Sequence, residues 1–100
     1  MQVRFRTNTL KRQYEISGKA ISTYGDKVGK KYIERINIIK KSHSIEDLKI
    51  IRPLRCHQLK GKRKGEWAIN LTEFYRLIFT LHGNNLEIAQ IEEVSKHYDD

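Results

Sequence analysis

The feature that most constrains the fold is residues 55–79, where alternating apolar segments follow a basic turn. Gly61 and Gly65 bracket three basic residues and supply the backbone freedom that a turn requires. Residues 67–71 and 75–81 then alternate between apolar and other side chains, the period of two expected for half-buried strands. The segment therefore predicts a strand, a basic turn and two further strands in an antiparallel meander.

The same alternation predicts which side chains face a core. The odd-numbered residues of 75–81 form an apolar row, whereas Arg76 falls on the opposite face together with the basic turn. Lys62, Arg63 and Lys64 in that turn would repel one another unless an anion shares the site. We therefore expect the function of the chain on the face away from the core.

The most regular helical pattern follows Thr23, which with Asp26 three residues later resembles a capping box. Apolar residues then recur at helical spacing and predict one buried helix face, made of Val28, Tyr32, Ile36 and Ile39. A shorter helix is expected to begin at Thr7 or Asn8, either of which could cap it, and to end near Gly18.

Shorter patterns complete the order of elements. Residues 2–6 predict a short strand, and residues 44–48 predict one helical turn capped by its first residue, with Asp47 reaching back. The meander should begin with a strand at residues 54–59, and a last strand at residues 86–94 alternates irregularly, which predicts burial on both faces or a bulge. This order predicts an α+β fold, with the N-terminal strand and two helices packed on a small antiparallel sheet.

The length, the net charge and the cysteine count are those of a small basic domain. The chain has 100 residues, enough for a single core, so residues 1–100 are expected to form one domain. The net charge of +8, with seven Lys or Arg and no acid between residues 49 and 64, indicates nucleic acid, an anionic membrane or an acidic protein as partner. Cys56 is the only cysteine, and neither a membrane-spanning run nor a signal peptide is evident, so a soluble cytoplasmic protein is expected.

The polar residues fit cleavage of an RNA backbone better than metal or nucleotide chemistry. The four histidines lack the spacing of metal ligands, and no glycine-rich phosphate loop of nucleotide-binding type is present. Attack by a ribose 2′-hydroxyl requires a base, cations near the developing phosphorane charge and an acid for the leaving oxygen. Side chains of suitable types are His57, Lys60, Arg63, Arg76, His97 and Tyr98.

The residue types alone leave two interpretations of these side chains open. In the first, Arg55 and His57 project from one face of their strand and act together with Arg76. In the second, Arg76 pairs with Glu66 or Glu87 and His57 has no role.

Residues 56–67 read Cys-His-Gln-Leu-Lys-Gly-Lys-Arg-Lys-Gly-Glu-Trp, and Arg76 follows in the next alternating strand. Two glycines, a lysine, an arginine and a tryptophan at these offsets resemble the HigB-type toxins of the RelE/ParE superfamily, the toxic components of bacterial toxin–antitoxin pairs. The length and the order of elements agree as well, so the resemblance covers essentially the whole chain. The tail differs, because the family ends in Asp-Tyr-His whereas His97 and Tyr98 stand here in reversed order.

The resemblance implies a RelE-like fold and a ribosome-dependent mRNA endonuclease without a metal or organic cofactor. It also implies, besides ribosome and mRNA, a HigA-like antitoxin that contains a helix-turn-helix, with operator DNA bound only through the toxin–antitoxin complex. The catalytic residues that it indicates are His57, Lys60, Arg76, His97 and Tyr98. Phosphate contacts are expected from Arg55, Lys62, Arg63, Lys64 and Lys96.

Two other functions are compatible with the sequence. A ParE-like member of the superfamily would inhibit DNA gyrase by binding, without nuclease activity, and a basic module would bind nucleic acid without any activity. The basic turn together with His57, Lys60 and Arg76 favours the nuclease, because the absence of His and Lys at these positions would favour the gyrase inhibitor.

Overall fold

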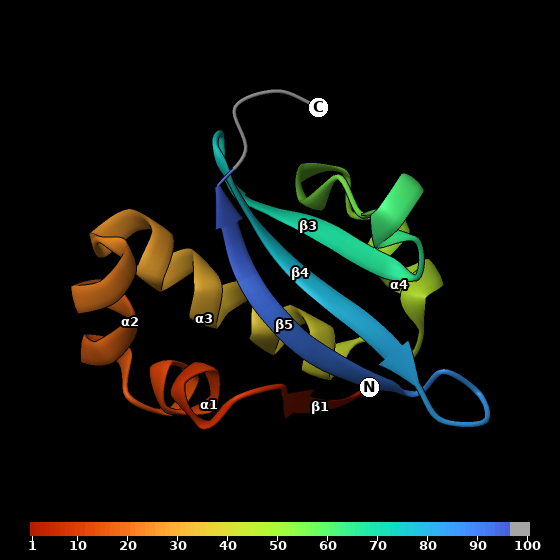
Figure 1. Ribbon diagram of the computed structural model, residues 1–100, viewed down its shortest axis with the longest axis horizontal. Coiled ribbons are helices and arrows are strands. Elements are labelled where there is room, and N and C mark those ends of the chain that lie inside the picture. Colours follow the sequence, from red (N-terminus) through yellow and green to blue (C-terminus); the bar gives the residue numbers. More distant parts are fainter. Residues whose placement is uncertain (97–100) are drawn as a thin grey trace.

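A computed structural model describes residues 1–96, in which four helices lie with a five-stranded sheet (Figure 1). The strands, in the spatial order β1-β5-β4-β3-β2, are β1 (Gln2–Phe5), β2 (His57–Gln58), β3 (Glu66–Thr72), β4 (Tyr75–His82) and β5 (Ile88–Lys96). The helices are α1 (Asn8–Glu15), α2 (Ser17–Tyr24), α3 (Asp26–Lys41) and α4 (Ile45–Lys49), with 3-10 turns at Arg52–Leu54 and Gly61–Arg63. The predicted α+β class is confirmed.

The sheet is mixed rather than wholly antiparallel. Strands β2 to β5 pair antiparallel as predicted, but β1 pairs parallel with β5. The connection explains the difference, because the chain leaves β1 through the helices and reaches β5 last, and parallel neighbours require such a crossover. As a result β1 forms one edge of the sheet and the short β2 forms the other.

The first helical region contains two helices where one was predicted. Helix α1 begins at a predicted cap, where Thr7 Oγ1 accepts a hydrogen bond from the Leu10 amide at 3.2 Å. It ends before Gly18, because Ile16 adopts an extended backbone conformation, and α2 starts directly afterwards. The predicted capping box at Thr23 is wrong, since Thr23 lies inside α2 and its hydroxyl donates to a backbone carbonyl of that helix.

Two glycines allow α2 and α3 to pack closely. Gly25 has φ of +90°, which L side chains rarely adopt, and it ends α2 and begins α3. A Cβ atom at Gly29 would lie 2.7 Å from backbone atoms of Ile21, so a larger residue would push the helices apart. The predicted buried face of α3 is confirmed, since it holds the buried residues Val28, Tyr32, Ile36 and Ile39.

Helix α4 forms where a helical turn was predicted, but with a different cap. Asp47 reaches back as expected, and its Oδ2 accepts from the His43 amide at 2.8 Å. Ser44 occupies the cap position without a side-chain cap hydrogen bond. Asp47 therefore ties the residue before the cap to the helix, whereas the predicted cap by the Ser44 side chain is absent.

The first strand of the meander is much shorter than predicted. The strand expected at residues 54–59 is reduced to the two residues of β2. Pro53 lies in a 3-10 turn, and Arg55 after it is left-handed with φ of +48°, so the chain reaches strand geometry only at His57. The prediction that Arg55 and His57 project from one strand face is therefore wrong.

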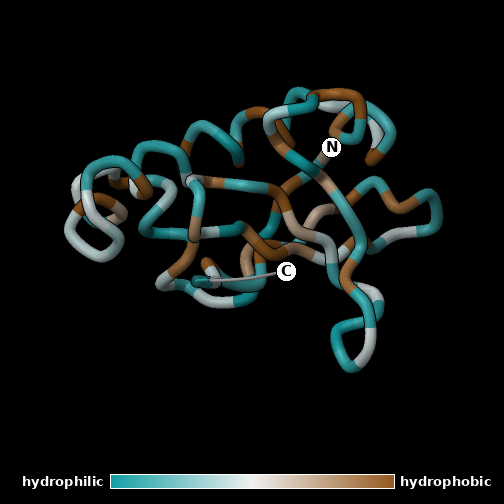
Figure 2. The backbone as a smooth tube through the Cα atoms, turned by 90° about the horizontal axis from the view of Figure 1, so that it is seen from above, coloured by the Kyte–Doolittle hydropathy of each residue, from teal (hydrophilic) through white to brown (hydrophobic). Residues whose placement is uncertain are grey.

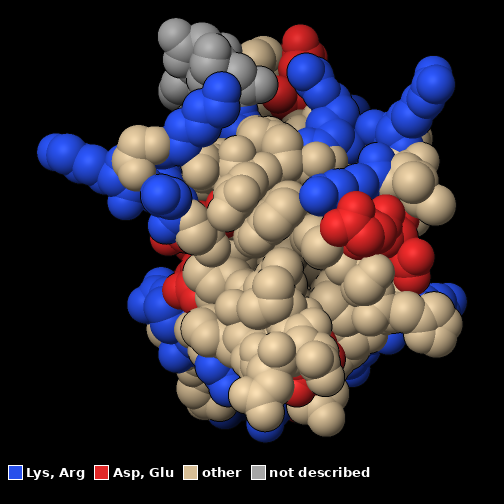
Figure 3. Space-filling view, turned by 90° about the vertical axis from the view of Figure 1, so that its right-hand side faces the viewer, with Lys and Arg blue, Asp and Glu red and all other residues tan. Residues whose placement is uncertain are grey.

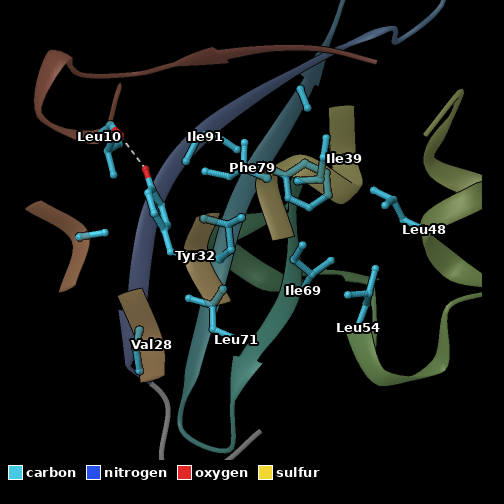
Figure 4. Packing of buried hydrophobic residues seen from close by; sticks show 14 residues of the cluster. Leu10, Val28, Tyr32, Ile39, Leu48, Leu54, Ile69, Leu71, Phe79 and Ile91 are labelled. Atoms are coloured by element: carbon cyan, nitrogen blue, oxygen red, sulfur yellow. Dashed lines mark hydrogen bonds between the residues drawn. The ribbon is translucent and has the colours of Figure 1, made fainter. Parts of the chain in front are cut away.

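The hydrophobic core lies between the sheet and the helices (Figure 4). Phe79 and Leu77 of β4 are fully buried there, as predicted, together with Tyr32 of α3. The Tyr32 hydroxyl donates to the Leu10 carbonyl at 2.7 Å, and burial raises the pKa of this phenol above its ordinary value. Trp67, which begins the alternating segment 67–71 and is expected from it to face the core, is only half-buried and packs against the core's margin.

The centre of β4 is covered on both faces. Phe79 faces the helices, whereas Ile78 points to the opposite face and is nevertheless fully buried. Strand β5 carries the predicted bulge, because Ile78 lies opposite Glu93 while Phe79 lies opposite Ile91, which leaves Glu92 without a cross-strand partner on β4. The irregular alternation of the last strand is thus explained by an extra residue.

Hydrophobic residues are distributed in short runs along the backbone (Figure 2). The longest described helix, α3, has 16 residues and carries a charged face. No helix among residues 1–96 combines the length and the apolar character needed to cross a membrane.

Phe79→Ala should lower the free energy of unfolding by about 3–5 kcal/mol, because it removes a fully buried aromatic ring from between the sheet and α3. Urea denaturation followed by circular dichroism measures this change. Phe74→Ala is the control, since Phe74 is 44% exposed at the β3–β4 turn, and it should cost about 1 kcal/mol or less. A Phe79→Ala protein that unfolds at the parental urea concentration would contradict the observed packing.

Candidate active site

The register of the strands arranges the sheet face opposite the helical core, here called the open face, in rows. His57 on β2 lies opposite Ala68 on β3, which lies opposite Ile78 on β4. Ile78 in turn lies opposite Glu93 on β5. Directly opposed residues share a face of the sheet, so His57 lies on the open face, and Arg76, two residues before Ile78, lies on the same face beside this row.

His57 and Arg76 meet on the open face. Arg76 Nη1 lies 3.3 Å from His57 Nε2, and His57 Nδ1 lies 2.8 Å from the carbonyl oxygen of Arg55. A guanidinium can only donate and a carbonyl can only accept, so Nε2 accepts from Arg76 and Nδ1–H donates to Arg55. These contacts select the neutral imidazole with its proton on Nδ1. The basic nitrogen of His57 therefore points at a cation.

Arg76 is more buried than the sequence pattern predicted, with 6% of its surface exposed. Burial, and then repulsion from Arg55, lowers the pKa of Arg76 from its ordinary value, which is high enough that the guanidinium stays charged. The two carboxylates considered as its partners have other contacts, since Glu66 accepts from Arg63 and Glu87 accepts from a backbone amide of the β4–β5 turn. The site thus holds a largely buried cation beside an exposed histidine.

The side chain of Arg63 joins two strands of the sheet that are not neighbours. Its Nε donates to Glu66 at 2.6 Å and its Nη2 donates to Glu93 at 3.0 Å. Glu66 lies on β3 and Glu93 on β5, so the guanidinium lies across β4, the strand between them. Burial lowers the pKa of Arg63, but hydrogen bonds and charge interactions with the two carboxylates outweigh burial, and the net pKa is raised. The anions that share the basic turn are therefore the protein's own carboxylates, Glu66 and Glu93. The predicted contact of Arg63 with phosphate stays a prediction.

The remaining cations of the predicted site lie at the surface. On the face shown in Figure 3, Lys and Arg side chains project around an uncharged centre, mainly over its upper half. Besides His57, the exposed residues among those predicted to contact phosphate or take part in cleavage are Arg55, Lys60, Lys62, Lys64 and Lys96. His97 and Tyr98 lie outside the described residues, so their assigned roles stay predictions.

A polar network that the sequence pattern did not predict lies on the β1 side of the open face. Glu92 Oε2 accepts from the Thr80 hydroxyl and from Gln90 Nε2, both at 2.7 Å. Thr80 Oγ1 also lies 2.7 Å from His82 Nε2, and Arg6 Nε lies 3.5 Å from Glu92 Oε1. The only signal in the sequence is the irregular alternation of the last strand, because the bulge at Glu92 brings this carboxylate to Thr80.

Other reactive groups do not add to the site. Burial is the main cause that raises the pKa of Cys56 to about 11, so at neutral pH this thiol is protonated and a poor nucleophile. Within the described part of the chain, no three His, Cys, Asp or Glu side chains are grouped so that they could hold a metal ion.

Residues 3–93 match the family of HigB-like toxins, described as RelE-like toxins of the type II toxin–antitoxin system HigB. The chain belongs to this family. The matched span includes both members of the His57–Arg76 pair and the basic turn. No individual curated protein matches the chain.

Solved structures share the fold of this HigB-like toxin at low sequence identity. The YoeB/ParE toxin from Agrobacterium tumefaciens has a TM-score of 0.63 at 18% identity, over 98% of this chain and 100% of that chain. YafQ from E. coli strain BL21(DE3) has a TM-score of 0.62 at 14% identity, over 95% and 91%. The YoeB–YefM complex from Staphylococcus aureus contains a chain with a TM-score of 0.61 at 18% identity, over 98% of both. At these identities the likeness confirms the predicted RelE-like fold alone.

Proposed function

We propose that this HigB-like toxin inhibits translation as an endoribonuclease that cleaves mRNA on the ribosome, without a metal or organic cofactor. The observation that carries the proposal is the contact between His57 and Arg76, a neutral imidazole against a largely buried guanidinium. Such a pair supplies a base and a fixed cation within reach of one phosphodiester.

In the proposed reaction the ribose 2′-oxygen bonds to the adjacent phosphorus while the bond to the 5′-oxygen breaks, which leaves a 2′,3′-cyclic phosphate and a 5′-hydroxyl. His57 Nε2 takes the proton of the 2′-hydroxyl. Arg76 turns its donors from His57 to the phosphate oxygens on which charge grows, and the exposed Lys60 adds a second cation. An acid must protonate the leaving 5′-oxygen, and His97 and Tyr98 are the predicted candidates.

The other basic residues serve binding rather than chemistry in this proposal. Lys62 and Lys64 are exposed on the basic turn and contact phosphates as solvated cations. Arg63, held between Glu66 and Glu93, keeps that turn in place over the sheet. Because the ribosome positions the mRNA, orientation itself contributes several kcal/mol, and a small set of catalytic groups suffices.

The partner of the proposed nuclease is an antitoxin. The family description places its members in type II toxin–antitoxin systems, which supports this partnership. We assign to this chain a HigA-like antitoxin with a helix-turn-helix, which binds operator DNA on behalf of the complex. The ribosome and mRNA as targets imply that the toxin acts in the cytoplasm.

The competing functions would not need the observed pair. A gyrase inhibitor or a passive nucleic-acid-binding module acts by binding, so neither requires a histidine whose basic nitrogen is held at a guanidinium. The contact between His57 and Arg76 therefore favours the nuclease.

Arg76→Ala should reduce cleavage by about 10²-fold or more, because it removes the cation that meets the growing phosphorane charge. Arg76→Lys should recover little of the loss, since an ammonium lacks the planar fork of the guanidinium. Single-turnover cleavage of mRNA on a programmed ribosome measures the rate, and a sedimentation assay measures ribosome binding, which Arg76→Ala should retain. Circular dichroism establishes that each variant is folded.

Lys62→Ala and Lys64→Ala are the matched controls, because both remove an exposed cation from the adjacent turn. Each should weaken RNA or ribosome binding and reduce the salt dependence of that binding by about one counterion. The cleavage rate of the bound complex should stay unchanged. If Arg76→Ala cleaves at the parental rate while the two lysine variants are inactive, the active site lies in the basic turn and the proposal fails.

Co-expression with the protein encoded by the adjacent reading frame should give a stable complex and restore the growth of cells that produce the toxin. The reason is that a toxin of net charge +8 exposes basic surface that a cognate antitoxin can neutralise. Affinity purification through a tag on the toxin, followed by a growth assay, tests this expectation. Two proteins that neither co-purify nor restore growth would contradict the assigned partner.

A further inference from the structure

A second row of side chains crosses the open face next to the row of the proposed catalytic histidine. Asn70 on β3 lies opposite Arg76 on β4, and Arg76 lies opposite Ser95 on β5. The neighbours of Asn70 along β3, Ile69 and Leu71, are buried in the core, so the side chain of Asn70 points to the open face. Directly opposed residues have Cβ atoms about 4.5–5.5 Å apart. Asn70 therefore lies immediately beside the cation of the proposed active site.

The side chain of Arg76 extends toward the strand that carries Asn70. Arg76 Nη1 contacts His57 on β2, and β3 is the strand between β4 and β2. Ala68, which lies opposite His57 on β3, has only a methyl group as its side chain and leaves room for the guanidinium above it. Arg76 thus crosses β3 from the level of Asn70 to the level of Ala68, which places the carboxamide of Asn70 at the proposed catalytic pair.

The carboxamide of Asn70 has no hydrogen-bond partner within residues 1–96, although the residue is half-buried. Only its backbone carbonyl is used, and it accepts from Arg35 Nε of α3 at 2.9 Å. No buried side-chain nitrogen or oxygen in the described chain lacks a partner, so the carboxamide reaches solvent at the open face. The bond from α3 fixes the backbone at this point. A positioned donor is therefore available to a ligand.

The charges around Asn70 select an anion as that ligand. Burial, and then the positive charge of Arg55, lower the pKa of Arg76, so the two guanidiniums lie close enough to repel each other. Two acids of the open face, Glu66 and Glu93, are held by the ion pairs of the basic turn. An anion that enters beside the two guanidiniums relieves their repulsion.

A carboxamide at this place suits a phosphate oxygen. Its Nδ2 carries two N–H donors and no charge, so it can bond to an anionic oxygen without neutralising the guanidiniums. A carboxylate in the same position would instead pair with the guanidiniums and exclude phosphate. A nucleobase could also bond to the carboxamide, but a neutral base gains little from two adjacent cations. A phosphodiester uses the donor and the cations together.

We infer that Asn70 is a further catalytic residue, which donates a hydrogen bond from Nδ2 to a non-bridging oxygen of the scissile phosphate. The inference rests on the proposed nuclease and adds a neutral donor to its active site. As the 2′-oxygen attacks, charge grows on the non-bridging oxygens, and a fixed donor stabilises the phosphorane more than the starting phosphate. The guanidinium of Arg76 supplies charge, and the carboxamide of Asn70 adds a donor of fixed direction.

Asn70→Ala should slow single-turnover cleavage of mRNA on a programmed ribosome about tenfold or more, because one donor to the phosphate is lost. Asn70→Asp should slow it about 10²-fold or more, since the carboxylate keeps the shape, lacks the donors and pairs with the guanidiniums. The melting temperature of Asn70→Asp, followed by circular dichroism, should not fall below that of the parent. The control is Asn84→Asp in the exposed β4–β5 turn, which makes the same chemical change and should stay within about threefold of the parental rate.

Sulfur substitution at the scissile phosphate tests the contact itself. In each of the two phosphorothioate diastereomers, sulfur, which is a weak acceptor, replaces one non-bridging oxygen. The diastereomer with sulfur at the position that Asn70 contacts should be cleaved more slowly by the parent. Asn70→Ala should reduce this sulfur effect at least about threefold and leave that of the other diastereomer unchanged, because a donor that is absent cannot be lost again.

The outcomes separate this inference from the proposed function. If Asn70→Ala cleaves at the parental rate, or slows without a change confined to one diastereomer, the inference is overturned and the nuclease proposal stands. A changed codon preference with both sulfur effects unchanged would mean that Asn70 contacts a base, and the inference would be wrong. If the parent itself does not cleave mRNA, the nuclease proposal fails, and the inference fails with it.

Discussion

The burial of β4 on both of its faces is the constraint on which the rest of the structure depends. Phe79 is fully buried on the side of the helices, and Ile78 and Arg76 are buried on the open face. A buried guanidinium costs free energy unless its donors find acceptors, and the nitrogen of His57 is one of them. The strand that holds the core together is thus also the strand that fixes the cation of the proposed active site.

The same strand explains the arrangement of charge. Arg63 reaches across β4 from the basic turn to carboxylates on both neighbouring strands, Glu66 and Glu93. Two ion pairs on one guanidinium hold a turn that would otherwise repel itself. The exposed lysines on either side remain available to phosphate, so the turn is anchored by acids and still presents a basic surface.

Local patterns predicted the fold well wherever neighbours in sequence decide the structure. The buried face of α3, the hairpin of β3 and β4 and the bulge of the last strand all follow from the periods of apolar residues. The break at Ile16, the left-handed Arg55 and the parallel pairing of β1 did not follow, because backbone angles and long-range pairing decide them.

The sequence named candidate residues for the site but did not predict their contacts. His57 and Arg76 were both identified, yet their meeting depends on which strands are neighbours in the sheet. The Arg63–Glu93 ion pair joins residues 30 positions apart, beyond the reach of any local pattern. Glu92 needed the bulge to reach Thr80. Contacts between distant strands are set by register, which the sequence alone does not display.

The central claim is that His57 and Arg76 act as one unit, and a double-mutant cycle tests it most directly. Single-turnover cleavage of ribosome-bound mRNA would be compared for the parent, His57→Ala, Arg76→Ala and the double variant. Residues that act together are strongly non-additive, so the double variant should be within about threefold of the slower single variant. Losses that multiply in the double variant, or a parental rate in either single variant, would contradict the account.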